Sequence, residues 1–431
     1  MVCRSKNFIL LPITVIIFSS TCFQTAPVFA QDWARPGIKF LQRVDIRNLG
    51  YPLVNEIPAN SSAVTSLITA SDGKIYGGTC GEEAYLFIFD PAINKVRHLG
   101  KIRGQEAIHH ALVEDRDGFI YLGTGKSPFA QVPISPGGIG KEFIDVTLWR
   151  DIRKYFEDYP GGHLYLYDPT QSNDKVKLPE MECDLSDLGI PVPNNSIYAL
   201  TTSPEKDRIY GLSYPDGHFF IYDITGKQFK DLGEIDSRLV FHGPERHWRS
   251  LPRALVCDDS GKVYTTGTNG NIVYYDPGSG EIIHTDLRIP QDVYPAQSDY
   301  SYAVAECFAT AADGTIYGGS SDGYLFSFNP KKLELLNLGK LRSERRIRAI
   351  TVGKNAKVYI MAGERASTKP CQLYRYDPQR GNFTRLGLLI ADRSPHYYWR
   401  GYQFDCMTTG TDGTIYFGES ERRSHLFLYI P

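Results

Sequence analysis

The stretch SLITASDGKIYGGTCGEEAYLFIFDP, residues 66–91, contains most of a unit that recurs along the chain. A strand of small and apolar residues is followed by an Asp-Gly turn, the string Ile-Tyr-Gly-Gly-Thr, and an alternating strand that ends in Asp-Pro. A last strand, residues 96–100, ends in Leu-Gly. The apolar period is two rather than 3.6, which excludes a helical solenoid. Asp-Gly between two strands is typical of a tight hairpin because glycine tolerates positive φ. The unit is therefore predicted to be a sheet of four antiparallel strands.

Seven copies of this unit are marked by an Ile-Tyr or Val-Tyr pair. Their tyrosines are Tyr76, Tyr121, Tyr210, Tyr264, Tyr317, Tyr359 and Tyr416. An Asp-Pro turn or a close relative ends the third strand at Asp90, Asp168, Asp223, Asp276, Asn329 and Asp377. Seven four-stranded repeats predict an all-β, seven-bladed β-propeller. Because a propeller closes as a ring, residues 31–431 are predicted to form a single domain.

The way in which the ring closes is also predicted. The seventh copy ends in its third strand, residues 426–431, and lacks a fourth. Residues 40–50 (FLQRVDIRNLG) are comparable to the fourth strand at residues 332–339 and precede the first blade. We therefore expect the N-terminal strand to complete and close the last blade.

Residues 1–30 are predicted to be a signal peptide. Arg4 and Lys6 precede a mostly apolar run, and Val28-Phe29-Ala30 provides small residues at the usual cleavage positions. Pro12 and several Ser and Thr interrupt the run, which disfavours a membrane anchor. No later segment is apolar enough to span a bilayer. We therefore expect a secreted protein, periplasmic or extracellular.

Composition limits the classes of partner. A net charge of −2 favours neither nucleic acid nor a membrane surface, so any recognition by charge must be local. Apolar residues make up 42% and charged residues 22%, as is ordinary for a globular protein, and we expect a monomer.

The mature chain keeps six cysteines. Their spacing selects no disulfide pairing and shows no zinc motif, so disulfides and buried free thiols are equal alternatives. The six cysteines are Cys80, Cys183, Cys257, Cys307, Cys371 and Cys406.

Unusual loops are predicted to gather on one face of the ring. Loops from a fourth strand to the next first strand, and from a second to a third, share a face in a propeller. Four such loops, at residues 126–162, 236–252, 288–302 and 390–404, are long and rich in aromatic, histidine and arginine residues. Conspicuous loops on a rigid frame often carry function. We expect the working end of the channel on this face.

Alignment of the repeats on the tyrosine gives three columns in the first strands. One column is large and apolar (Leu67, Leu112, Leu200, Leu255, Phe308, Ile350, Met407), and the column before it is small (Ser66, Ala111, Ala199, Ala254, Cys307, Ala349, Cys406). The column one step earlier is polar and varied: Thr65, His110, Tyr198, Arg253, Glu306, Arg348 and Asp405. Packing explains the first two columns. The third is the pattern expected of a site at the channel mouth.

Three members of the polar column, His110, Tyr198 and Arg253, are the predicted catalytic residues. They belong to consecutive blades, so they should be neighbours around the mouth. The predicted substrate-binding residues are Arg348 within the ring and His109, His247, Tyr302, Tyr398 and Arg400 overhanging it. A guanidinium binds a carboxylate, and His and Tyr serve as proton acceptor and donor. The structural alternative is that Arg253 and Arg348 pair with Glu306 and Asp405.

A base, an acid and a neutralising cation are what β-elimination of a uronate glycan requires. The proton at C5 of the sugar becomes removable only when the neighbouring carboxylate is neutralised. At His109-His110, Tyr198 and Arg253 the chain resembles the seven-bladed propeller polysaccharide lyases, such as ulvan lyases and rhamnose–glucuronate lyases. That resemblance implies that His, Tyr and Arg at the mouth act on a glucuronate-type residue of an acidic polysaccharide. It implies no required cofactor. Some of these relatives hold a structural metal ion, for which no ligand set is matched here.

Other functions compete with this one. A propeller that binds glycans or a protein partner without catalysis would present the same aromatic loops. A sialidase-type glycoside hydrolase is less favoured, because its S-x-D-x-G-x-T-W turns are absent and carboxylates in the polar column are few. Quinone-dependent dehydrogenases normally show a Trp in most blades, and this chain has four Trp in all. Metal-dependent lactonases need several acidic or amide side chains at the channel, and the polar column has only two acids, Glu306 and Asp405.

Overall fold

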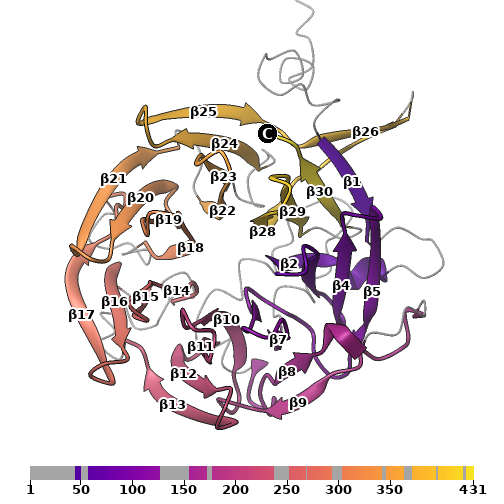
Figure 1. The fold of residues 1–431 in the computed structure, drawn as a ribbon, viewed down its shortest axis with the longest axis horizontal. Coiled ribbons are helices and arrows are strands. Elements are labelled where there is room, and N and C mark those ends of the chain that lie inside the picture. The colour runs from indigo at the N-terminus through magenta and orange to yellow at the C-terminus, as the bar shows by residue number, and fades with distance from the viewer. Residues whose placement is uncertain are drawn as a thin grey trace, which may run out of the picture. The chain divides into compact units, whose positions relative to one another are not determined.

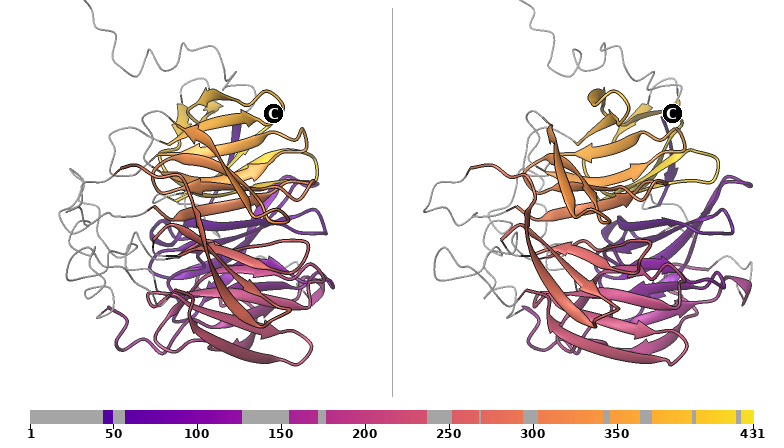
Figure 2. Two further views of the ribbon diagram at one scale, coloured as in Figure 1. Left: turned by 90° about the vertical axis from the view of Figure 1, so that its left-hand side faces the viewer. Right: turned by 60° about the vertical axis from the view of Figure 1, so that its left-hand side comes forward.

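The computed structural model describes residues 44–49, 57–126, 155–171, 177–236, 252–267, 269–293, 303–341, 346–363, 371–394, 397–420 and 424–431. The predicted signal peptide lies outside them. The described residues form seven four-stranded antiparallel sheets around a central channel, which confirms the predicted seven-bladed propeller (Figure 1). Figure 2 shows the strands of successive blades stacked against one another.

The blades are numbered along the chain, and the strands of each run from the channel outward. Blade 1 contains β2 (Ala63–Thr69), β3 (Ile75–Cys80), β4 (Ala84–Asp90) and β5 (Lys95–Ile102); blade 2 contains β6 (Leu112–Glu114), β7 (Ile120–Gly123), β8 (Leu164–Tyr167) and β9 (Ser186–Gly189). Blade 3 contains β10 (Ser196–Thr202), β11 (Arg208–Tyr214), β12 (His218–Asp223) and β13 (Gln228–Glu234); blade 4 contains β14 (Val256–Cys257), β15 (Val263–Thr266), β16 (Asn271–Asp276) and β17 (Glu281–Arg288).

The remaining blades follow the same order. Blade 5 contains β18 (Ala305–Thr310), β19 (Ile316–Ser320), β20 (Tyr324–Asn329) and β21 (Glu334–Lys340); blade 6 contains β22 (Ile347–Val352), β23 (Val358–Ala362), β24 (Gln372–Asp377) and β25 (Asn382–Gly387). Blade 7 contains β28 (Phe404–Thr409), β29 (Ile415–Glu419), β30 (His425–Tyr429) and β1 (Val44–Asn48). A separate hairpin, β26 (Ile390–Ser394) and β27 (Tyr397–Arg400), connects blades 6 and 7, and short 3-10 helices lie at η1 (Ala59–Ser61) and η2 (Pro169–Gln171).

Closure of the ring by the N-terminal strand is confirmed. Strand β1 pairs antiparallel with β30, with Ile46 opposite Phe427, and thereby completes blade 7. Val44 and Ile46 are buried in the core of this blade, whereas Asp45 between them is exposed. The alternation explains why residues 40–50 look like a fourth strand.

A buried hydrogen bond explains the Ile-Tyr signature. In blade 1 the hydroxyl of Tyr76 donates to Asp72 Oδ2 (3.0 Å), while Asp72 Oδ1 accepts the backbone N–H of Lys74 (2.9 Å). In blade 4 the hydroxyl of Tyr264 donates to Asp258 Oδ2 over the same distance, 3.0 Å. In these two blades the tyrosine therefore stabilises, through its hydroxyl, the turn that precedes its own strand.

The two glycines after the tyrosine permit close packing. A Cβ on Gly77 would lie 2.1 Å from the ring of Phe87 in the same blade. A Cβ on Gly78 would lie 2.6 Å from Ile108, at the start of the next blade. The core accordingly lies between blades: Ile88 of blade 1 packs in one cluster with Leu112 and other residues of blade 2.

Candidate functional site

Bulges in the inner strands direct the polar column into the channel. In five inner strands the pairing register with the second strand shifts at the polar position, which leaves that residue without a partner in the ladder. The residues concerned are Thr65, Tyr198, Glu306, Arg348 and Asp405. A bulge of this kind re-aims one side chain while the strand continues. Three of these residues, Glu306, Arg348 and Asp405, line the channel cavity together with His110 and Arg253, whereas Thr65 and Tyr198 are not part of its lining.

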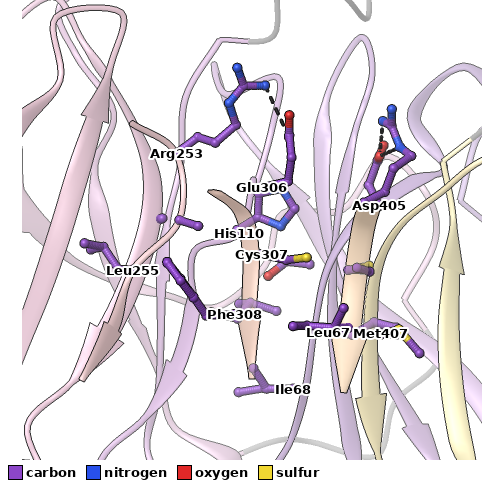
Figure 3. A pocket seen from close by; sticks show the side chains of 18 of the residues that line it. Leu67, Ile68, His110, Arg253, Leu255, Glu306, Cys307, Phe308, Asp405 and Met407 are labelled. Carbon is purple, nitrogen blue, oxygen red and sulfur yellow. Dashed lines mark hydrogen bonds and ion pairs between the residues drawn. The ribbon is translucent and has the colours of Figure 1, made fainter. Parts of the chain in front are cut away.

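The channel cavity has a volume of about 150 Å³. Its polar lining is formed by the side chains His110, Arg253, Glu306, Arg348 and Asp405. Figure 3 shows Arg253, Glu306, His110 and Asp405 toward one end of the cavity, with the apolar residues Leu255, Phe308, Leu67 and Met407 toward the other. The cavity thus has a charged mouth and an apolar wall.

The structure brings His109, His110 and Tyr198 together at the junction of blades 2 and 3. The ring of His109 is stacked on that of Tyr198, with centroids 4.7 Å apart, and the ring of His110 lies 5.7 Å from Tyr198. The Nε2 of His109 donates to the carbonyl of Lys126 (3.2 Å). The backbone N–H of Leu200 donates to the carbonyl of His110 (3.1 Å), which joins the two inner strands. The His–Tyr group is therefore held by backbone as well as by ring contacts.

Burial determines the protonation of these groups. It lowers the pKa of His109 to about 4, against the opposing effect of the Lys126 carbonyl. It also lowers the pKa of His110, although Asp405 and Glu306 act in the opposite direction. Burial raises the pKa of Tyr198. At neutral pH both histidines are therefore neutral, and the phenol keeps its proton.

Arg253 is buried, 4% exposed, and shares one carboxylate with a second arginine. Glu306 Oε2 accepts hydrogen bonds from Arg253 (3.3 Å) and Arg346 (2.7 Å). Burial alone would raise the pKa of Glu306, but Arg253 and Arg346 outweigh it and hold this pKa at about 2. Arg346 was not among the predicted residues. Its signal in the sequence was its place two residues before Arg348.

Arg348 pairs with Asp405 on the opposite side of the ring. Gln403 Nε2 also donates to Asp405 (3.2 Å). Burial would raise the pKa of Asp405, but Arg348 outweighs it, with help from neighbouring hydrogen bonds, and the pKa is about 2. The predicted structural pairing of Arg253 and Arg348 with Glu306 and Asp405 is thus present. With Arg346, three guanidiniums and two carboxylates are present among the described side chains of the mouth.

The remaining predicted residues are less closely placed. His247 and Tyr302 lie outside the described residues, as does the side chain of Tyr398. Arg400 stands at the base of the β26–β27 hairpin, with its guanidinium 4.7 Å from the ring of Tyr402 and donating to its hydroxyl (2.8 Å). Figure 1 shows β26 projecting outward from the ring beside β1. Arg400 is therefore on the hairpin rather than on the inner strands.

Metal and thiol chemistry find little support in the described part of the chain. Within it, no three His, Cys, Asp or Glu side chains are grouped so as to hold a metal ion. Cys307 and Cys406 are free thiols in the cavity wall, and burial raises the pKa of both. Among the same residues, no helix is long and apolar enough to cross a membrane.

Comparison with known proteins gives the fold but no family. No family model and no curated protein matches the chain. By structure it is similar to virginiamycin B lyase from Staphylococcus aureus, with a TM-score of 0.56 and 11% identity over 90% of this chain and 99% of that one. It is also similar to the extracellular domain of a putative one component system from B. thetaiotaomicron (TM-score 0.52, 14% identity, 89% of this chain and 40% of that one). A fungal alcohol oxidase in complex with copper gives a TM-score of 0.57 at 14% identity, over 90% of this chain and 76% of that one.

Proposed function

We propose that this protein is a secreted polysaccharide lyase that cleaves uronate-containing glycans by β-elimination at the channel mouth. The observation that carries the proposal is the pairing of a neutral histidine and a protonated tyrosine with a buried cationic cluster. His110 and Tyr198 supply the proton acceptor and donor, and Arg253 with Arg346 supplies the positive charge.

The proton transfers follow from the protonation states. Arg253 neutralises the uronate carboxylate, which makes the C5 proton removable. Neutral His110 accepts that proton, and the electron pair forms the C4–C5 double bond while the C4–O bond breaks. Tyr198 donates its proton to the departing glycosidic oxygen and regains one from the protonated histidine. Burial keeps both groups in the protonation states from which these roles start, a neutral imidazole and a protonated phenol.

The similar folds support this proposal and define its rival. The virginiamycin B lyase is itself a lyase, and a variant of it in which one histidine is replaced by alanine is described as catalytically inactive. The extracellular domain from B. thetaiotaomicron belongs to a putative one component system, and a purely binding role for this chain is the corresponding alternative. Export after removal of residues 1–30 and action as a monomer are parts of the same proposal.

The test is the ultraviolet absorbance of the unsaturated uronate product over a panel of acidic polysaccharides. We expect one member to give this product, and His110→Ala and Tyr198→Phe to lower turnover about 10²-fold or more. Arg253→Ala should lower turnover as well, while Arg346 keeps Glu306 paired. Tyr165→Phe, on strand β8 away from the cavity lining, is the matched control and should retain activity.

Two results would contradict the proposal in different ways. If no glycan gives product but the His110, Tyr198 and Arg253 variants lose affinity for an acidic glycan, the mouth is a binding site. If affinity is also unchanged in these variants, neither catalysis nor binding occurs at the mouth.

A further inference from the structure

The wall of the cavity beneath the charged mouth is apolar. The large column of the inner strands faces it, with Leu67, Leu112, Leu200, Leu255, Phe308, Ile350 and Met407 all contributing. The proposed elimination uses the mouth and gives this wall no role. These side chains also pack into the core between blades, as Leu67 and Met407 do, and the surface that they leave facing the cavity is apolar and lies directly below the ring of charges.

The volume of the cavity suits a compact apolar group. The cavity, charged mouth included, has a volume of about 150 Å³, and an engineered cavity of that volume is large enough to bind benzene. The thiols in the wall add no polar partners, because Cys307 donates to the Ile347 carbonyl (3.6 Å) and Cys406 to the Val64 carbonyl (3.7 Å). Of the side chains that line the cavity outside the charged ring, Ser66 alone therefore offers water a hydroxyl.

The charged and apolar parts lie on the same short segments. Arg253 and Leu255 are two residues apart in blade 4, and Glu306 and Phe308 are two residues apart on β18. Figure 3 shows this order from the mouth inward for both pairs. A ligand whose carboxylate reaches Arg253 would thus place a group a few bonds away against Leu255 and Phe308.

We propose that mouth and channel together bind an amphiphilic carboxylate, with its charge at Arg253 and a compact apolar group, up to the size of a phenyl ring, in the channel. This inference shares one premise with the proposed function, namely that Arg253 binds the carboxylate of the ligand. It adds that the acidic ligand carries an apolar substituent close to that carboxylate.

Titration of the whole mature protein with benzoate and with acetate tests the inference. Benzoate should bind roughly tenfold more tightly or better, because its ring leaves water for the channel. In methyl-labelled protein, benzoate should shift the resonances of Leu255, Ile350 and Met407, and acetate should not. Leu255→Asn should weaken benzoate alone, whereas Arg253→Ala should weaken both acids.

Equal affinity for the two acids, or methyl resonances that do not move with benzoate, would overturn the inference. The comparison of the two acids on the unaltered protein keeps the test valid if a variant fails to fold. A protein that binds benzoate but releases no unsaturated uronate contradicts only the lyase. One that cleaves uronate glycans but does not distinguish benzoate from acetate contradicts only the channel subsite.

Discussion

His109 is stacked on Tyr198, and its Nε2 donates to the Lys126 carbonyl. A second proton on this ring would place a positive charge in a buried position without water to solvate it. Burial therefore lowers the pKa of His109 from its ordinary 6.5 to about 4. Between these values the unfolded chain binds the proton and the folded one does not, so acid favours unfolding. We expect His109 to contribute roughly 3 kcal/mol of stability above pH 6.5, lost progressively as the pH falls toward 4.

Urea unfolding at a series of pH values between about 7 and 4 measures this loss. Other groups also titrate in acid, so the comparison is with His109→Gln, whose amide can still donate to the Lys126 carbonyl. The stability of this variant should fall less steeply with acid by the amount assigned to His109. Parallel curves for the two proteins would show that the histidine is not neutral and buried in the folded state.

The sequence predicted which residues surround the mouth better than it predicted how they pair. The polar column could be found because the small and large columns beside it keep their type in every blade. The sharing of Glu306 between Arg253 and Arg346 was not predicted, because Arg346 lies outside the aligned polar column. The bulges, each of which leaves the residue of the polar column without a partner in the ladder, have no composition signal of their own.

At the scale of elements, the tyrosine of the Ile-Tyr or Val-Tyr pair stabilises the turn before its strand in blades 1 and 4. Tyr264 is 1% exposed, and its hydroxyl donates to Asp258, whose other oxygen accepts the backbone N–H groups of Ser260 and Lys262. Tyr264→Phe should destabilise the protein by about 1–3 kcal/mol, because it leaves a buried carboxylate oxygen unsatisfied. Chemical denaturation would measure the change.

Tyr274→Phe is the matched control for this substitution. Tyr274 lies in the same blade, 7% exposed, and its hydroxyl has no hydrogen bond to another described residue. Its replacement should alter stability by clearly less than that of Tyr264. Equal effects would mean that loss of a hydroxyl, and not the tie to the turn, weakens the blade.

The hairpin β26–β27 is an element that sequence patterns did not predict. Residues 390–404 were expected to be a loop because they lie between the last strand of one repeat and the first strand of the next. The hairpin is anchored by Trp399, whose Nε1 donates to the buried carboxylate of Glu419 (3.1 Å), and Glu419 also accepts from His425 Nδ1 (3.0 Å). Both partners belong to blade 7, so this contact depends on the ring and leaves no local pattern.

At the scale of the whole molecule, stability depends on the closure of the ring. Blades 1 to 6 are each continuous in sequence, but blade 7 takes three strands from the C-terminus and β1 from the N-terminus. The clusters of the core join neighbouring blades, as when Val44 and Ile46 pack with Met361 of blade 6 and Phe427 of blade 7. The closure was predictable because the last repeat lacks a fourth strand and the N-terminal segment contains an additional one. Pairing of the two segments accounts for both observations.

Ile46 tests the importance of this closure. Its side chain is 1% exposed in the core of blade 7, and Ile46→Ala should cost about 2–5 kcal/mol of unfolding free energy. The exposed Asp45 lies on the same strand with the same backbone pairing, so Asp45→Ala should cost under about 0.5 kcal/mol. If closure holds the ring together, amide exchange should rise in Ile46→Ala at β28 to β30 and also in the neighbouring blades 1 and 6. Faster exchange confined to β1 would show instead that the strand frays alone and that the other blades stand without it.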